Sequence, residues 1–292
     1  MSRSKLVHGI VAATSTVLVL VHSVPNLYPN FVVNHQGFKN VDIPCHIEQA
    51  FEEVAKKMNL SHSEKVKLFI NNGCSSVSVG STWLPGGAAI GISRLYLYTD
   101  LEQLSESGLV FKGKKLNLDS KAGKKLSKAL LFNDEELKFI LAHEVSHLQN
   151  LDFTTNCFLP AWWLYFTYRA IPIILANLPP NSLLKIAVQG SLWLSSYWIF
   201  SRQNTTLHHN REFAADQNAA MLGVTYVKGG INATMKRMKV NETLRGLNRQ
   251  DGKNLYSIEG NDLKDWAHPK LSERLRKLEE IYVEKYLGDK TT

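Results

Sequence analysis

The pentad His143-Glu144-Val145-Ser146-His147 lies late in an apolar run of this 292-residue chain. Two histidines spaced four residues apart project from the same face of a helix, one turn from each other. That spacing lets both imidazoles reach one tetrahedral zinc ion. Glu144 then lies beside the remaining open position, where it can take a proton from an attacking water. The pentad therefore predicts a zinc site of the kind that hydrolyses peptide bonds, against the alternative of a helix with two surface histidines.

The residues around the pentad favour a buried helix. Asn133 is a good N-cap, and Glu136 three residues later completes a capping-box pattern, so we predict that the helix begins near Asp134. Polar side chains in such a buried segment need partners, and a metal ion would provide one. The apolar face of the helix consists of Leu137, Ile140, Leu141, Val145 and Leu148.

Glu212 is the candidate for the third zinc ligand, because a catalytic zinc takes three protein ligands and keeps one open position. It lies on a helix predicted over residues 210–222 and capped by its first residue, an asparagine. Asp216, on the same face, could accept the free ring N–H of a ligating histidine and fix its tautomer. The competing ligands are His208 and His209. The alternative interpretation is that Arg211, Glu212 and Asp216 form a solvated charged face.

Four stretches of the sequence occur in the order typical of one peptidase family. They are His143-Glu144-x-x-His147-x-x-Asn150-x-Asp152, Arg211-Glu212-x-x-Ala215-Asp216, His268-Pro269-x-Leu271-x-x-Arg274, and the upstream glycine-bearing residues 79–92. With these stretches, residues 40–282 resemble the M48 metallopeptidases, most closely the HtpX-type membrane proteases.

The resemblance implies a membrane-anchored zinc endopeptidase. It implies that His143, His147 and Glu212 bind one Zn²⁺ per chain. It further implies that Glu144 is the general base and that Asp216 orients a ligand histidine. The cleaved substrate would be a protein or peptide, including membrane proteins.

The resemblance also implies that His268 lies near the site and helps to stabilise the oxyanion. The competing interpretation is a histidine at a helix entry, with Pro269 at the first helical position and only a capping role. HtpX-type proteins carry two N-terminal spans, whereas this sequence shows at most one. The topology, and the side of the membrane that the site faces, therefore stay open.

Two regions of the sequence are typical of membrane association. Residues 10–24 are apolar and follow a basic start, but the stretch is short, so a signal-peptide core, a short anchor and an organellar presequence all remain open. The segments 157–178 and 183–200 are longer, rich in tryptophan and tyrosine, and separated by a turn at Asn181. They predict a transmembrane or membrane-associated hairpin, against a buried hairpin in a soluble protein.

The fold class predicted is α+β: a mostly helical zincin-like metallopeptidase domain with a small β-sheet, plus the membrane hairpin. Strands are expected at 65–70 and 75–80, joined by a turn, and at 88–92 and 95–98. An edge strand among them could hold an extended substrate. Helices are expected at 45–58 and 270–287. The predicted division of the chain is an N-terminal hydrophobic segment (1–30), two parts of the peptidase domain (31–156 and 201–292), and the hairpin (157–200).

The charge and the cysteine content of the chain limit the kinds of partner that we expect. The formal net charge is +8, and lysines cluster within residues 112–128, which predicts either a solvated loop or contact with anionic lipid headgroups. No recognition motif accompanies the charge, so we do not expect nucleic-acid binding. The 3 cysteines form no CxxC pair and do not indicate a disulfide framework. The expected function is a membrane-associated, multi-pass zinc endopeptidase. The alternatives are a proteolytically silent zinc-containing membrane scaffold or chaperone, and a soluble secreted zincin.

Overall fold

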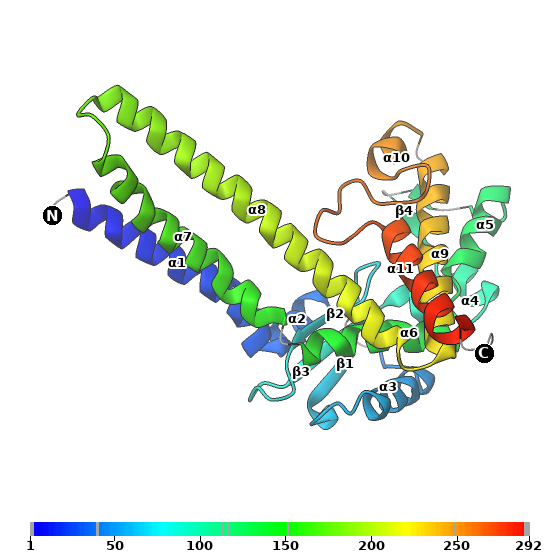
Figure 1. Ribbon diagram of the computed structural model, residues 1–292. Helices are drawn as coiled ribbons and strands as arrows, with labels where there is room; N and C mark the ends of the chain where they lie inside the picture. The colour runs from blue at the N-terminus through cyan, green and yellow to red at the C-terminus, as the bar shows by residue number, and fades with distance from the viewer. Residues whose placement is uncertain are drawn as a thin grey trace.

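Three long helices form an arm that extends from the rest of the molecule in the computed structural model (Figure 1). They are α1 (Arg3–Leu27), α7 (Asp152–Ala176) and α8 (Ser182–Ala220). The remaining elements gather into one domain at the root of this arm. The structure describes residues 3–38, 41–111, 114–115, 117–150, 152–247 and 249–288. The α+β fold predicted from the sequence is confirmed.

The sheet of the domain has three strands in the order β1-β3-β2, namely β1 (Val66–Asn71), β2 (Val77–Gly80) and β3 (Ala88–Ser93). β1 pairs with β3 in parallel, and β2 pairs with β3 antiparallel. The prediction that the first two strands form a hairpin was therefore wrong. The Asn71 side-chain amide donates to the carbonyls of Ser75 (2.9 Å) and Gly91 (3.2 Å), so it ties the intervening turn to β3.

β3 is the central strand of the sheet, and all its residues are buried. Its small side chains allow close packing; a side chain on Gly91, for example, would collide with the Phe69 ring. The expected strand at 95–98 is instead a 3₁₀ turn over Arg94–Leu97, which begins where the Ser93 hydroxyl accepts a hydrogen bond from the amide of Leu95 at 3.3 Å. This turn ends the sheet before a fourth strand forms.

The main core lies between the sheet, α3 (Cys45–Lys57), α6 (Asp134–Gln149) and α9 (Val224–Leu247). The helix predicted at 45–58 is confirmed as α3. The expected helix at 270–287 is present as α11 (Leu271–Tyr282) with a π-helical last turn, Val283–Leu287. The other elements are η1 (Ser63–Lys65), α2 (Pro29–Gln36), α4 (Leu101–Glu106), β4 (Val110–Phe111), β5 (Lys114–Lys115), α5 (Lys121–Leu130) and α10 (Arg249–Leu255).

The second half of the lysine-rich segment is helical, not a loop: α5 begins at Lys121, after the N-cap Ser120, whose hydroxyl accepts a hydrogen bond from the amide of Gly123 at 3.0 Å. α5 buries Leu126 and Leu130 and turns its lysines outward. It lies on the side of the domain away from the arm (Figure 1). Lys112 is outside the described residues. Because α5 lies away from the arm, its lysines are not placed to contact a membrane that the arm would enter.

The arm helices pack along their length. α1 lies beside α7 (Figure 1), and α7 and α8 are joined by the Trp163 indole, which donates to the Ser196 hydroxyl at 3.0 Å. The Thr167 and Ser196 hydroxyls are 2.7 Å apart in the same contact. The outer surface of the arm remains apolar. It exposes Val7, Ile10, Val17, Leu20 and Val21 of α1, Phe158, Trp162, Phe166 and Ile173 of α7, and Leu183, Ile186, Leu194 and Trp198 of α8.

Residues Val7–Leu27 are long and apolar enough to cross a membrane: the segment has 21 residues and contains an 18-residue window with a mean hydropathy of 1.7. The apolar segment predicted at 10–24 was therefore too short, because the helix continues through Pro25 to Leu27. Among the described residues this is the only helix that meets the criterion, so the predicted crossings at 157–178 and 183–200 are not supported by length and composition. Prolines, tyrosines and Arg169 lower the hydropathy of α7, as Lys185 and Gln189 lower that of α8.

Candidate metal centre

The helix that carries the pentad begins where the sequence predicts. The Asn133 side chain accepts a hydrogen bond from the amide of Glu136 at 2.9 Å, and the Glu136 carboxylate accepts from the amide of Asn133 at 2.8 Å. This capping box satisfies two backbone donors at the helix start. The Lys236 ammonium also bonds the Glu136 carboxylate at 2.7 Å and compensates its burial. The start of α6 is thereby fixed, and with it the direction in which both pentad histidines project.

His143, His147 and Glu212 meet at one point. The two histidine Nε2 atoms are 3.1 Å apart. The Glu212 carboxylate lies 3.5 Å from His143 Nε2 and 3.3 Å from His147 Nε2. One ligand atom from each residue lies within 4.8 Å of the others, so the cluster could hold a metal ion. Two imidazoles and one carboxylate are the donor set that a zinc with an open fourth position takes, and the residues therefore fit such an ion.

Each histidine is held from behind by its own carboxylate. The Asp216 carboxylate lies 2.9 Å from Nδ1 of His143, and the Asp152 carboxylate lies 2.8 Å from Nδ1 of His147. A carboxylate at Nδ1 fixes the ring and leaves Nε2 free to bind a metal. The structure thus shows Asp216 beside a pentad histidine, in the position expected. Sequence reasoning assigned no role to Asp152, although its place five residues after His147 was the available signal.

Two arginines neutralise these carboxylates. Arg274 of α11 is buried and donates to both oxygens of Asp216, at 2.7 Å and 2.6 Å, while a third nitrogen lies 3.3 Å from Glu212. Arg211 of α8 lies 3.3 Å from Asp152 and donates to the Asn156 side chain at 2.7 Å. Carboxylate oxygens in a buried site need such partners. The sequence did not indicate these roles, because Arg274 and Arg211 lie far along the chain from Asp216 and Asp152, on other helices.

These contacts shift the protonation of the cluster. Burial disfavours the charged form of His147, but its bonds to Asp152 and Glu212 outweigh burial and raise its pKa to about 10. Burial alone would raise the pKa of Glu212, yet the two histidines and Arg274 lower it well below its usual value. The same balance raises the pKa of His143. Without a metal, His147 therefore keeps its proton at neutral pH, and metal binding must displace it.

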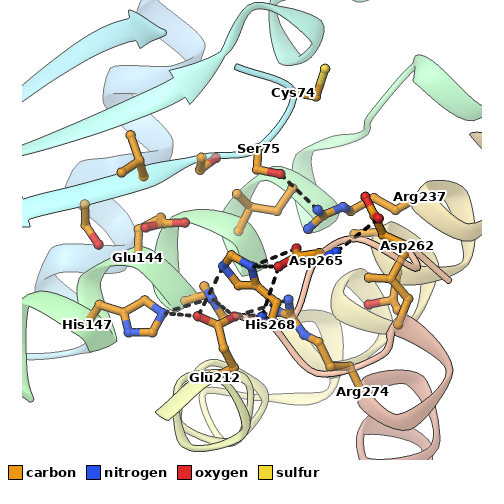
Figure 2. Close-up of a pocket in the computed structure, with 18 of the residues that line it drawn as sticks. Cys74, Ser75, Glu144, His147, Glu212, Arg237, Asp262, Asp265, His268 and Arg274 are labelled. Atoms are coloured by element: carbon orange, nitrogen blue, oxygen red, sulfur yellow. Dashed lines mark hydrogen bonds and ion pairs between the residues drawn. The ribbon is translucent and has the colours of Figure 1, made fainter. Parts of the chain in front are cut away.

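Glu144 is buried and lines the same cavity as the histidines (Figure 2). Among the residues that the structure describes, none makes a hydrogen bond or ion pair with its carboxylate, so the group is free to contact a molecule in the cavity. Figure 2 shows it on the side of the pentad that faces β2.

His268 lies on the loop before α11, on the side of the cluster where Figure 2 labels Asp265. Its Nε2 is 3.9 Å from the Glu212 carboxylate, and its Nδ1 is 2.8 Å from Asp265. The N-cap of α11 is Lys270, so the competing interpretation, with Pro269 as the first helical residue, was wrong. The bond from Asp265 raises the pKa of His268, against the effect of burial.

The two competing ligands lie outside the cluster. His208 lines the cavity, and burial lowers its pKa. His209 bonds the carbonyl of Trp266 at 3.2 Å. Glu212 itself is part of α8, which runs unbroken from its N-cap, Asn181, to Ala220. The predicted helix start at residue 210 was wrong, because the chain that leaves the arm stays helical through that asparagine.

The cluster opens into a cavity of 630 Å³ at the root of the arm. All three arm helices contribute to its lining, through Asn26 of α1, Asn156 of α7 and Arg211 of α8. The Asn26 side chain also accepts a hydrogen bond from the amide of Gly80 at 2.9 Å, which ties α1 to the end of β2. β2 lines the cavity and is an edge strand of the sheet in the described part of the chain.

Comparison with known proteins agrees with this geometry. The model of peptidase family M48 matches residues 46–282. Transmembrane protein 177 of Danio rerio is 28% identical over 232 residues, which cover 74% of this chain and 71% of the relative. Its counterpart in Homo sapiens is also 28% identical, over 75% of this chain and 71% of the relative. That of Mus musculus is 26% identical over 89% of this chain and 84% of the relative. The chain belongs to peptidase family M48.

Proposed function

We propose that this protein is a membrane-associated zinc-dependent endopeptidase, with His143, His147 and Glu212 as the ligands of one Zn²⁺. One observation carries the proposal. Each histidine of the cluster has its Nδ1 bonded to a carboxylate, and the Nε2 atoms converge with Glu212 on one point. Such ring orientation is typical of a metal site. A solvated charged face would not bury these groups and order them in this way.

Zinc, when bound, supplies a Lewis acid that polarises the peptide carbonyl and makes water more acidic. Glu144 accepts the proton of the attacking water and passes it to the amine that leaves. Its carboxylate faces the cavity without a protein partner in the described residues, as a general base requires. His268 is the proposed donor to the developing oxyanion, since its Nε2 lies 3.9 Å from the Glu212 carboxylate of the cluster.

The proposed substrate is an extended polypeptide that lies along β2. An edge strand has unpaired backbone donors and acceptors, and a peptide that pairs with them is held in register without any requirement on its side chains. β2 lines the cavity together with Glu144 and His143. A peptide on this strand would thus pass directly over the cluster.

We also propose that the arm is the membrane-associated part. α1 has the length and composition of a span, and we infer that α7 and α8 enter the membrane packed against it. The apolar residues that all three helices expose support this inference. The polar contacts of Trp163 and Thr167 with Ser196 are turned inward between α7 and α8, as polar groups in lipid must be. The arrangement is then a multi-pass one.

The experiment that tests the activity compares Glu144→Gln with the unaltered protein, both purified in detergent and loaded with zinc. The amide keeps the shape of the side chain but cannot accept the proton, so we expect zinc content near one per chain and no hydrolysis of an unfolded protein substrate. Glu135→Gln is the matched control, because it makes the same change on α6 away from the cavity. Equal turnover by the Glu144 variant would refute the mechanism. A silent unaltered protein that still binds zinc would favour the scaffold alternative.

A further inference from the structure

Arg237 of α9 is the third arginine that lines the cavity, beside Arg211 and Arg274. The other two are paired with carboxylates of the metal centre. Arg237 instead donates to the Ser75 hydroxyl at 2.9 Å. Among the described residues, no carboxylate forms an ion pair with it. Its charge is therefore half-buried in the cavity wall and held in place by a neutral partner only.

The surroundings of Arg237 favour an anionic partner. Figure 2 draws Asp262 beside Arg237, but no ion pair joins the two side chains. The Asp262 Oδ1 instead accepts hydrogen bonds from the amides of Lys264 at 2.8 Å and Asp265 at 3.2 Å, within its own loop. Asp265 is bonded to His268. The same cavity also has an apolar part of its wall, which consists of Leu126 and Leu130 of α5 with Val240 and Leu244 of α9. An ion pair is stronger beside such a wall than in bulk water.

The position of Arg237 along the substrate path follows from β2. Ser75, which holds the guanidinium, precedes the strand by two residues. At the other end of the strand, the Ser81 hydroxyl donates to the carbonyl of Leu148, at the end of α6 (3.4 Å). α6 therefore runs beside the strand with Glu144 between the two ends, and Figure 2 shows Ser75 and Arg237 on the side away from His147.

We propose that Arg237 is a specificity-determining residue that binds a carboxylate of the substrate peptide. This inference rests on the proposed function. On an extended substrate along β2, the bound carboxylate would lie on the Ser75 side of the cleaved bond. Its source is either an acidic side chain or the free C-terminus of a short peptide, because both present the same two oxygens to the guanidinium.

The test is a cleavage profile. The zinc-loaded full chain in detergent is incubated with a mixture of synthetic peptides that carry aspartate, asparagine, lysine or leucine at each position, with free or amidated C-termini. The same mixture is given to Arg237→Gln, Arg237→Glu and the control Arg276→Glu. Arg276 is an exposed arginine on α11 that pairs with Glu280, outside the cavity. The products are quantified by mass spectrometry, and kcat and KM are measured for the best acidic peptide and its asparagine twin.

We expect the unaltered protein and Arg276→Glu to prefer an acidic residue at a fixed position on the Ser75 side of the cleaved bond. Arg237→Gln should lose about 10–100-fold in kcat/KM for the acidic peptide, mostly through KM, because a charge-assisted hydrogen bond is lost. It should leave the asparagine twin almost unchanged. Arg237→Glu should shift the preference to lysine, which a merely misfolded variant would not do. If the preference is present with free C-termini and disappears when the C-termini are amidated, the carboxylate that Arg237 binds is the C-terminus of the peptide.

Two results would overturn the inference. Cleavage by the unaltered protein without any acidic preference would refute the role of Arg237 while the peptidase function stands. The same preference in Arg237→Gln as in the unaltered protein would do so as well. If neither the unaltered protein nor the Arg276 control cleaves any peptide, the proposed function itself is wrong, and this inference falls with it.

Discussion

Replacement of Arg274 by methionine should destabilise the metal centre more than any change of an exposed charge. The guanidinium is 8% exposed and makes two hydrogen bonds to Asp216, which is 2% exposed, and one ion pair with Glu212. Methionine fills much of the same volume but leaves both carboxylates without their cation. Removal of one partner of a buried ion pair costs about 3–5 kcal/mol. At about 2 °C per kcal/mol for a chain of this size, the melting temperature should fall by roughly 6–10 °C.

The assay is thermal unfolding of the full chain in detergent, followed by tryptophan fluorescence with zinc bound. Arg276→Met is the matched control, because it removes the same side chain two residues later on α11, where the partner is the exposed Glu280. Exposed pairs of this kind contribute about 0–1 kcal/mol. The double variant Arg274→Met with Asp216→Asn should recover part of the loss, since it no longer buries an unpaired Asp216 charge. Equal shifts for Arg274→Met and Arg276→Met would refute the account of the site as a buried charge network.

Four further outcomes are expected. Metal analysis after Glu212→Ala should show loss of zinc, whereas His208→Ala should retain it, since His208 is outside the cluster; the reverse result would exchange the ligands. Asp152→Asn should weaken zinc binding by about 10–100-fold, measured by competition with a chelating dye, and unchanged affinity would remove it from the site. His268→Ala should retain zinc and lower kcat by about 10²–10³; normal turnover would leave it without a catalytic role. Carbonate extraction should leave the chain in the membrane fraction, and deletion of Val7–Leu27 should weaken this retention.

Local signals in the sequence predicted the local elements of the centre. The capping pair Asn133 and Glu136, the apolar periodicity of α6 and the spacing of His143 and His147 all act between residues a few positions apart. Such interactions determine where a helix begins and which side chains share a face, whatever the rest of the chain does. The candidate ligand Glu212 was found through the order of motifs typical of the family, and the structure shows it beside both histidines.

Longer-range features could not be obtained from local patterns. The residues around Asn71 are typical of a tight turn between two paired strands. In the structure, β3 lies between β1 and β2 and pairs with both, because strand pairing depends on the packing of the whole sheet and not on the turn alone. The helix start predicted at residue 210 was wrong for a related reason. An asparagine is a cap only where the chain before it leaves the helical conformation, and α8 enters from the arm already helical.

The sequence by itself determined the spacing of the two pentad histidines, the α+β class and the apolar character of the N-terminal segment, since each depends on composition or on residues a few positions apart. Only the tertiary structure decided that Asp152 holds His147 while Asp216 holds His143, and that Arg274 neutralises the latter carboxylate. It also decided that Arg237 faces the cavity without a carboxylate partner in the described residues. These pairings join residues from different helices, and their energies depend on distance and burial, which exist only once the chain has folded.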